Sequence, residues 1–191
     1  RISKTANNKT TWYVRDASGN VMAVYEKQAT ANLKQTEVHL YGSSRIGIWN
    51  RNTDVVSPPT GEITNFERGN KFFELSNHLG NVLVTVSDRK LQVSAGGVNV
   101  DYYTADVVSA TDYYPGGMEM PARTFRGGPG GHRYGFNGKE RDKDMHSLTA
   151  YDYGFRIYNP AIGRFLSVDP LTQKYPELTP YQFASNNPIE G

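Results

Sequence analysis

Tyr151-Asp-Tyr-Gly-Phe-Arg-Ile-Tyr-Asn-Pro-Ala-Ile-Gly-Arg-Phe-Leu-Ser-Val-Asp-Pro170 is the stretch that most strongly determines the fold this sequence predicts. Aromatic residues alternate with polar or charged residues along it, as in a β-strand whose two faces meet different surroundings. An Asn-Pro-Ala-Ile-Gly turn interrupts the alternation: Pro160 suits its second position, and Gly163 permits a left-handed backbone at its exit. Arg156 and Arg164 flank the turn, and each can pair with a carboxylate or stack on a tyrosine ring. The stretch therefore predicts a β-hairpin.

The same period of two recurs along the rest of the chain. Short strand candidates are separated by turns rich in glycine and polar residues, and hydrophobic helical periodicity is hard to find. Successive hairpins of this kind predict an antiparallel meander, so we expect an all-β fold and one continuous β structure. The candidate strand pairs are residues 11–15 and 21–25, 38–41 and 45–49, 71–75 and 82–86, and 98–103 and 107–114.

Two of the turns resemble each other in sequence. Asp16-Ala-Ser-Gly-Asn-Val21 and Asn77-His-Leu-Gly-Asn-Val82 both begin with a polar residue and end in Gly-Asn-Val. Each follows an aromatic strand and precedes an apolar one, and glycine supplies the positive φ that such turns need. The echo predicts a repeat architecture, in which each hairpin buries one face against its neighbours.

Composition limits the classes of function. The chain has 191 residues, a formal net charge of +2, 13 tyrosines and no cysteine. A charge so balanced does not indicate nucleic acid as a partner, and the absence of cysteine excludes disulfides and Cys-type zinc sites. No apolar run approaches the roughly 18 residues of a membrane span. Neither end has a terminal element of its own, so we expect a segment cut from a longer polypeptide.

The long stretch resembles the core motif associated with RHS repeats, which is similar to YDYGxRxYxPxxGRFLSxDP. Further pieces of that core occur upstream and downstream in the same order, although Gly116 stands where the family usually has Phe. The resemblance covers roughly residues 72–189, and residues 1–71 look like the looser YD repeats. It predicts YD-repeat hairpins over 1–71 and an RHS core over 72–191. The additional matching pieces are Asn77-His-Leu-Gly-Asn-Val82, Tyr113-Tyr-Pro-Gly-Gly-Met118, Tyr134-Gly-Phe-Asn-Gly-Lys-Glu140, Tyr181-Gln-Phe183 and Asn186-Asn-Pro188.

What the resemblance implies is a structural function. YD repeats form β-hairpins that wind into a hollow shell, and a variable toxin or effector usually follows the core and can be held inside. Such proteins are secreted or lie on the bacterial surface, and serve interbacterial competition, insecticidal toxin delivery or cell contact. The expected partners are a C-terminal effector of the same polypeptide, the remaining YD repeats and secretion machinery; no cofactor is expected. We expect the closing hairpin to be held by Tyr151, Tyr153, Arg156, Tyr158, Pro160, Gly163, Arg164 and Phe165.

Asp169 is the candidate catalytic residue. Some RHS cores cut themselves with an aspartyl-protease-like pair, and Asp169 matches the first aspartate of that pair. Two close carboxylates cannot both ionise, which supplies one acid and one base. The second aspartate would fall after Gly191, and Thr172 stands where the self-cleaving pattern has glycine. Two readings stay open: an autoprotease core in the full-length protein, or an Asp169 that caps the turn before Pro170.

Other residue groups predict less specific roles. Four histidines, at positions 39, 78, 132 and 146, are too dispersed to suggest a metal site. The alternating charges of residues 139–144 predict a solvated face, and the Gly/Pro-rich residues 127–131 predict a flexible loop. A third function, adhesion through glycan binding, rests on tyrosine pairs that can stack on sugars or line a shell. These are Tyr102, Tyr103, Tyr113 and Tyr114.

Overall fold

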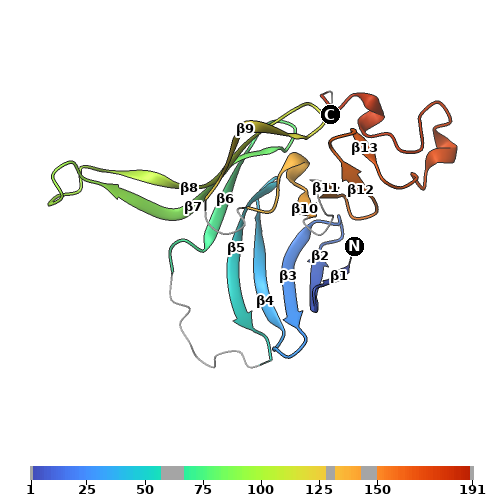
Figure 1. Ribbon diagram of the computed structural model, residues 1–191. Helices are drawn as coiled ribbons and strands as arrows, with labels where there is room; N and C mark the ends of the chain where they lie inside the picture. The colour runs from blue at the N-terminus through green and yellow to red at the C-terminus, as the bar shows by residue number, and fades with distance from the viewer. Residues whose placement is uncertain (1, 57–66, 128–131, 143–149, 190–191) are drawn as a thin grey trace. The chain divides into compact units, whose positions relative to one another are not determined.

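A computed structural model describes residues 2–56, 67–127, 132–142 and 150–189 of the chain, and contains strands and short 3-10 helices but no α-helix in these ranges. Each strand pairs with its neighbour along the chain, in the order β1 to β9 and, in a second sheet, β10 to β13 (Figure 1). The all-β prediction of successive hairpins is confirmed. The strands are β1 (Ser3–Ala6), β2 (Lys9–Arg15), β3 (Val21–Gln28), β4 (Lys34–Tyr41), β5 (Arg45–Asp54), β6 (Lys71–Ser76), β7 (Val82–Val93), β8 (Tyr102–Tyr113), β9 (Glu119–Arg126), β10 (Glu140–Asp142), β11 (Ala150–Asp152), β12 (Ile157–Asn159) and β13 (Arg164–Phe165), and the 3-10 helices are η1 (Phe136–Gly138), η2 (Thr172–Lys174) and η3 (Ala184–Asn186).

The chain folds as two compact units. The first contains residues 1–74 and 85–107, and the second contains residues 75–84 and 108–191. The polypeptide passes from one unit to the other within β6, β7 and β8. The sequence-predicted division into YD-repeat hairpins and core, at residues 71 and 72, stays a prediction.

One predicted hairpin is wrong. Residues 102–113 form the single strand β8, where the sequence predicted two strands meeting near residues 104–106. Asp106 is the residue of Thr104-Ala-Asp106 whose type most favours a turn, and the segment contains no glycine or proline. The Asp106 carboxylate instead accepts hydrogen bonds from the Ser87 hydroxyl, at 2.8 Å, and from the Arg89 guanidinium of β7.

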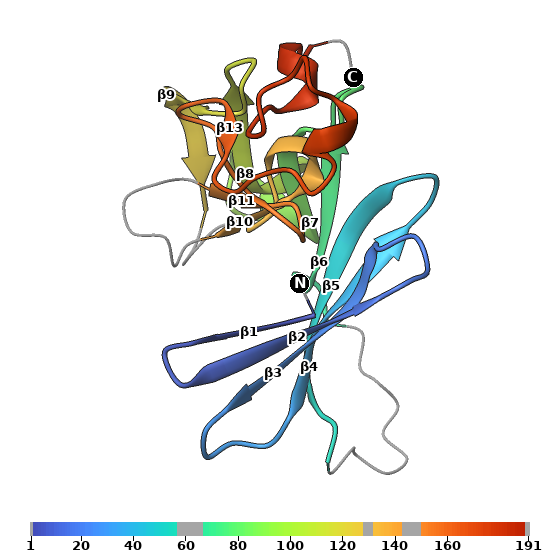
Figure 2. The same cartoon turned by 90° about the vertical axis from the view of Figure 1, so that its right-hand side faces the viewer.

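The sheet of the first unit buries one of its faces, and its twist is visible in Figure 2. Tyr13, Val24, His39 and Ile48, from β2 to β5, are at most 6% exposed. They are cross-strand neighbours in two pairs, Tyr13 with Val24 and His39 with Ile48. Alternate residues of these strands therefore build the core of the first unit, as the period of two predicted.

Gly47 lies where two backbones approach closely. It pairs with β6, and a Cβ at this position would lie 2.3 Å from the carbonyl oxygen of Phe72. We expect Gly47→Ala to lower the free energy of unfolding by about 1–3 kcal/mol, because the neighbouring strand must shift. Gly42→Ala is the matched control, since its Cβ would make an ordinary 3.6 Å contact with Ile46. Urea denaturation of both variants checks this, and equal losses would contradict it.

Four hairpin turns in the described chain share one pattern of backbone hydrogen bonds, although in residues 135–139 Asn137 also has a positive φ. In residues 16–20 the N–H of Asp16 donates to the carbonyl of Asn20 at 3.0 Å, and that of Gly19 donates back to Asp16 at 3.1 Å. The same pair of bonds recurs in residues 77–81, 114–118 and 135–139, always with a positive-φ glycine in the fourth position. Each is a three-residue loop that ends in a left-handed glycine.

The sequence revealed only two of these four turns. Asp16 and Asn77 each accept a hydrogen bond from the last N–H of their own turn, at 2.8 and 3.0 Å. That local capping gives both turns a recognisable polar first residue. The other two turns begin with Tyr114 and Gly135, whose side chains cannot act in this way.

Candidate functional site: the aromatic core of the signature hairpins

The aromatic residues of the signature stretch meet in one buried cluster of the second unit. Tyr151 on β11 and Tyr158 on β12 are 0% exposed, and Phe165 on β13 is 6% exposed. Their strands pair in register, Tyr151 with Tyr158 and Tyr158 with Phe165, so the three rings share one face of the small sheet. The aromatic core comprises Phe136, Tyr151, Tyr158, Phe165 and Phe183, with Tyr113 and Tyr153 packed against it.

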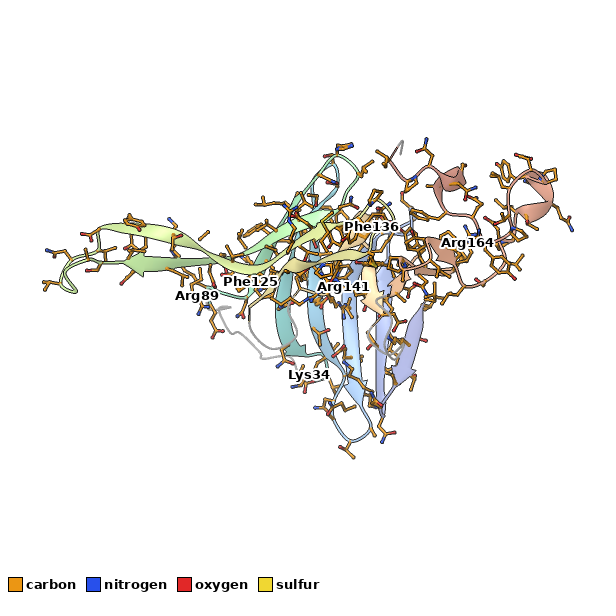
Figure 3. All side chains as sticks on the ribbon, turned by 45° about the horizontal axis from the view of Figure 1, so that its top comes forward. Lys34, Arg89, Phe125, Phe136, Arg141 and Arg164 are labelled. Carbon is orange, nitrogen blue, oxygen red and sulfur yellow. The ribbon has the colours of Figure 1, made fainter. Side chains whose placement is uncertain are left out.

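Phe136, in the short 3-10 helix η1, lies close to four other aromatic rings of this cluster. Its ring centroid lies 6.0 Å from those of Tyr113, Tyr151 and Phe183, and 6.1 Å from that of Tyr158. The side chain is 2% exposed, and Figure 3 labels it among the side chains of the second unit. Offset and tilted aromatic pairs at these distances add stability beyond the burial of apolar area.

Hydrogen bonds tie the core to the upstream turns. The Asn137 N–H donates to Oδ1 of Asn81 at 2.9 Å, which joins η1 to the turn at residues 77–81. The Tyr158 hydroxyl donates to the carbonyl of Gly116 at 2.7 Å, which joins β12 to the turn at residues 114–118. Segments that the resemblance matched one after another along the chain thus meet around a single cluster.

The predicted site residues fall into two groups. Tyr153 packs edge-on against Phe165, with ring centroids 5.4 Å apart, and Pro160 is buried. Gly163, at φ 63°, and Arg164 lie exposed at the turn between β12 and β13. The structure therefore places the aromatic members and Pro160 in the interior, and Gly163 and Arg164 at the surface.

Asp169 is held by contacts on both of its carboxylate oxygens. Oδ2 lies 2.9 Å from Nη1 of Arg156, and Oδ1 accepts the Leu171 N–H at 2.9 Å. The Arg156 guanidinium also lies over the Phe165 ring, 3.7 Å from its centroid. These contacts fasten the segment after β13 to the aromatic core.

Substituting Asp169 tests these contacts. We expect Asp169→Asn to lower the free energy of unfolding by about 1–2 kcal/mol, because Arg156 loses its charge partner while the turn cap is kept. Urea denaturation measures the loss, and Glu177→Gln is a control that removes one charge from an exposed position. Autoproteolysis by Asp169 stays a prediction: intact mass of the full-length polypeptide reports it directly, with and without the same substitution.

Burial raises the pKa of the core tyrosines, so the stability of the fold should depend on pH in the alkaline range. Desolvation raises the pKa of Tyr158 from 10.0 to about 12, and it also raises the pKa of Tyr113, Tyr151 and Tyr153. The neutral phenol is the form that the fold favours, so this contribution is fully present below pH 10 and is lost as pH rises towards 12. We expect stability to fall over that interval. Absorbance at 295 nm, followed beside circular dichroism, checks that these phenols ionise only as the fold is lost.

Charged residues near the core are less exposed than the sequence predicted. Arg141 is 7% exposed and lies 3.1 Å from the Glu119 carboxylate, and Asp142 is 6% exposed. The expected solvated face at residues 139–144 is therefore wrong for these two positions, and the ion pair with Glu119 permits the burial of Arg141. Residues 143 and 144 lie outside the described ranges.

The remaining candidates do not form a common site. Tyr102 and Tyr103 are 60% and 56% exposed, whereas Tyr113 packs against the aromatic core. No group of three potential ligands could hold a metal ion in the described part of the chain, and His146 lies outside it. Most of the predicted loop at residues 127–131 is likewise outside the described ranges. Among the described residues, no helix has the length and apolar character to cross a membrane.

Comparison with known proteins relates this architecture to two groups of proteins. No family model matches the chain. Toxin subunit YenC1 of Yersinia entomophaga is 36% identical over 98 residues, which are 51% of this chain and 9% of that protein. Toxin subunit YenC2 of the same organism is 37% identical over 93 residues, 44% of this chain and 8% of that protein. This chain is a homologue of RHS/YD-repeat toxin subunits. Salivary gland surface protein 1 of Aedes aegypti is 31% identical over 180 residues, 93% of this chain and 4% of that protein.

Solved structures show the same fold. The crystal structure of TcdB2-TccC3-Cdc42 matches 96% of this chain and 9% of its own, with a TM-score of 0.57 and 19% sequence identity. That of TcdB2-TccC3 matches 97% and 9%, with a TM-score of 0.50 and 20% identity. The chain thus spans less than a tenth of these relatives. The resemblance seen in the signature is accompanied by sequence similarity to the two toxin subunits.

Proposed function

We propose that this chain forms part of the wall of a hollow RHS/YD-repeat shell that encloses a C-terminal effector of the same polypeptide. The observation that carries the proposal is the 36% identity to a toxin subunit, together with a fold shared with TcdB2-TccC3. The remaining YD repeats complete the wall, and secretion machinery exports the whole. The segment itself has a structural role in the wall.

The internal construction supports a structural role. The signature residues are used for packing: Tyr151, Tyr158 and Phe165 form the buried core, and Arg156 is paired with Asp169. Shell walls made of hairpins need many turns and few exposed edges. The turn pattern that recurs in this chain provides the turns. Pairing between neighbouring hairpins covers most of the strand edges.

We also propose where the polypeptide is located and what its effector does. The polypeptide is secreted or displayed on a bacterial surface, where its effector acts in insecticidal toxin delivery or in competition between bacteria. Two relatives named as toxin subunits and one named as a surface protein support this setting.

Limited proteolysis of the full-length polypeptide tests enclosure. We expect the effector to resist protease in the native protein and to be digested after mild acid or denaturant opens the shell. A version with an internal deletion of residues 150–165 is the control, because it lacks β11, β12 and β13 but keeps the downstream effector. An effector digested equally fast in both proteins would overturn the proposal. Loss of β11–β13 from a shell that still protects its effector would instead exclude this segment from the wall.

A further inference from the structure

A cleft of about 380 Å³ lies in the second unit, where the turn at residues 77–81 and the strands β8 and β9 line it. Strand β9 runs beside β8 (Figure 1). The volume lies within the roughly 300–1,000 Å³ typical of small-molecule sites. The lining combines apolar side chains with polar and charged ones, so the cleft can orient a small ligand as well as bury it. Its polar, aromatic and bulge residues include Asn77, Asn81, Asp112, Tyr114, Met120 and Arg123.

A bulge in β9 directs two of these side chains into the cleft. Thr111 and Tyr113 are two residues apart on β8, but the residues that pair with them on β9 are five apart. The extra residues of β9 include Met120 and Arg123. In a regular strand, side chains three residues apart point to opposite faces, whereas both of these line the cleft. Bulges are frequent beside functional sites because they change the direction of a side chain.

The bulge is strained at Ala122. Its φ of 61° lies in the left-handed region, which a residue with a Cβ rarely adopts. The Thr124 hydroxyl donates to the carbonyl of Met120 at 3.3 Å, across the strained residue. Strained backbone concentrates at binding and catalytic sites, where the surrounding structure holds it in place. The strain therefore indicates a role for the side chains that the bulge directs into the cleft.

An ion pair gives the cleft both signs of charge. Nε of Arg123 lies 2.9 Å from Oδ2 of Asp112, and the two side chains remain 67% and 44% exposed. The contact engages one guanidinium nitrogen and one carboxylate oxygen, so further donors and acceptors of the pair can contact a ligand. The net charge of the pair is zero. It therefore suits a neutral ligand whose groups both donate and accept hydrogen bonds.

Two asparagines add donors to the lining. Oδ1 of Asn77 accepts the N–H groups of Leu79 and Asn81, each at 3.0 Å. Oδ1 of Asn81 accepts the Asn137 N–H at 2.9 Å, and Asn81 is 5% exposed. Because both oxygens already accept backbone N–H groups, the amides can offer N–H donors to a ligand. Side chains fixed in this way lose little conformational entropy when a ligand binds.

Tyr114 provides an aromatic surface at the same cleft. The residue is 42% exposed and opens the turn at residues 114–118, next to Pro115. An exposed tyrosine ring offers a rigid apolar surface with a polar tip. A pyranose ring has an apolar C–H face surrounded by hydroxyl groups, and each hydroxyl both donates and accepts. The aromatic ring, the neutral ion pair and the amide donors together match this chemistry.

We propose that the cleft is a binding site for a neutral saccharide. One sugar ring packs its C–H face on Tyr114, and its hydroxyls form hydrogen bonds with Asp112 and Arg123. The amides of Asn77 and Asn81 donate to a further hydroxyl. This binding goes beyond the enclosure of an effector and does not depend on it.

Frontal affinity chromatography over the immobilised full-length polypeptide tests the proposal with lactose, cellobiose and mannobiose. We expect retention of at least one of them, with a dissociation constant on the order of 1 mM or lower. Retention should persist at about 1 M salt, because the ligand is neutral. The permethylated form of the retained sugar cannot donate hydrogen bonds and should bind at least about tenfold more weakly. No retention of any of the three sugars would overturn the proposal, as would equal retention of the permethylated form.

Variants localise the binding. Tyr114→Ala should weaken it about tenfold, whereas Tyr114→Phe keeps the ring and should stay within about twofold of the wild type. Asp112→Asn keeps the size of the side chain but removes a charged acceptor, and should also weaken binding about tenfold. Tyr102→Ala is the matched control, since Tyr102 is 60% exposed and does not line the cleft.

The outcomes separate this cleft from binding by exposed tyrosines in general. Unchanged affinity in a folded Tyr114→Ala variant would overturn the assignment, and so would an equal loss in Tyr102→Ala. If Tyr114→Ala does not fold, Asp112→Asn and the permethylated sugar on the wild-type polypeptide decide the question.

Discussion

Phe136→Ala is expected to lower the free energy of unfolding of the second unit by about 3–5 kcal/mol. The ring is 2% exposed, and its centroid lies within about 6 Å of those of four other aromatic side chains. Those rings come from four different segments of the chain and cannot all move inward to fill the vacated volume. The loss therefore includes both the transfer of the ring to water and a residual cavity.

Phe125→Ala is the matched control for this substitution. Phe125 lies on β9 in the same unit but is 52% exposed, so the same chemical change should cost less than about 1 kcal/mol (Figure 3). Amide hydrogen exchange measures the effect locally, in β11 and β12. Both tryptophans, Trp12 and Trp49, lie in the first unit, so their fluorescence reports whether the damage stays in the second. Similar losses for Phe125→Ala and Phe136→Ala would contradict the central position of Phe136.

The hairpins were predictable because the residues that specify each turn lie within the turn itself. Asp16 and Asn77 cap their own turns, and Gly19 and Gly80 supply positive φ within the same five residues. At residues 104–106 Asp106 is compatible with a turn, and an alternation with a period of two could not distinguish one long strand from two short ones. The single long strand β8 was missed for this reason.

The aromatic core was only partly predictable. Alternation along the signature predicted strands with two different faces, and the structure places Tyr151, Tyr158 and Phe165 on one face of the small sheet. Nothing local indicates that Phe136 and Phe183 join them, because both belong to segments with little regular structure. Their burial depends on contacts between residues far apart in sequence. The order of the family motifs was the available signal, since it listed every segment that meets in this core.

Gly117→Ala is expected to destabilise the second unit by about 3 kcal/mol or more. Two effects add at this position. Its φ of 83° is unfavourable for a residue with a Cβ, which costs about 1–2 kcal/mol. A Cβ would also lie 2.4 Å from the Phe136 ring, so the ring or the turn must move.

Gly19→Ala separates the two effects. Gly19 occupies the same position of the same turn type in the first unit, with φ of 87° and the same backbone hydrogen bonds, but a Cβ there would meet nothing within 4 Å. It should therefore show the backbone cost alone, and the difference between the two variants measures how tightly Phe136 packs on the turn. In the double variant Gly117→Ala with Phe136→Ala, the collision is gone, so the loss should be smaller than the sum of the single losses. Strict additivity in urea denaturation would mean that the turn and the aromatic core are energetically independent, and that the glycine at residue 117 is required only for its backbone conformation.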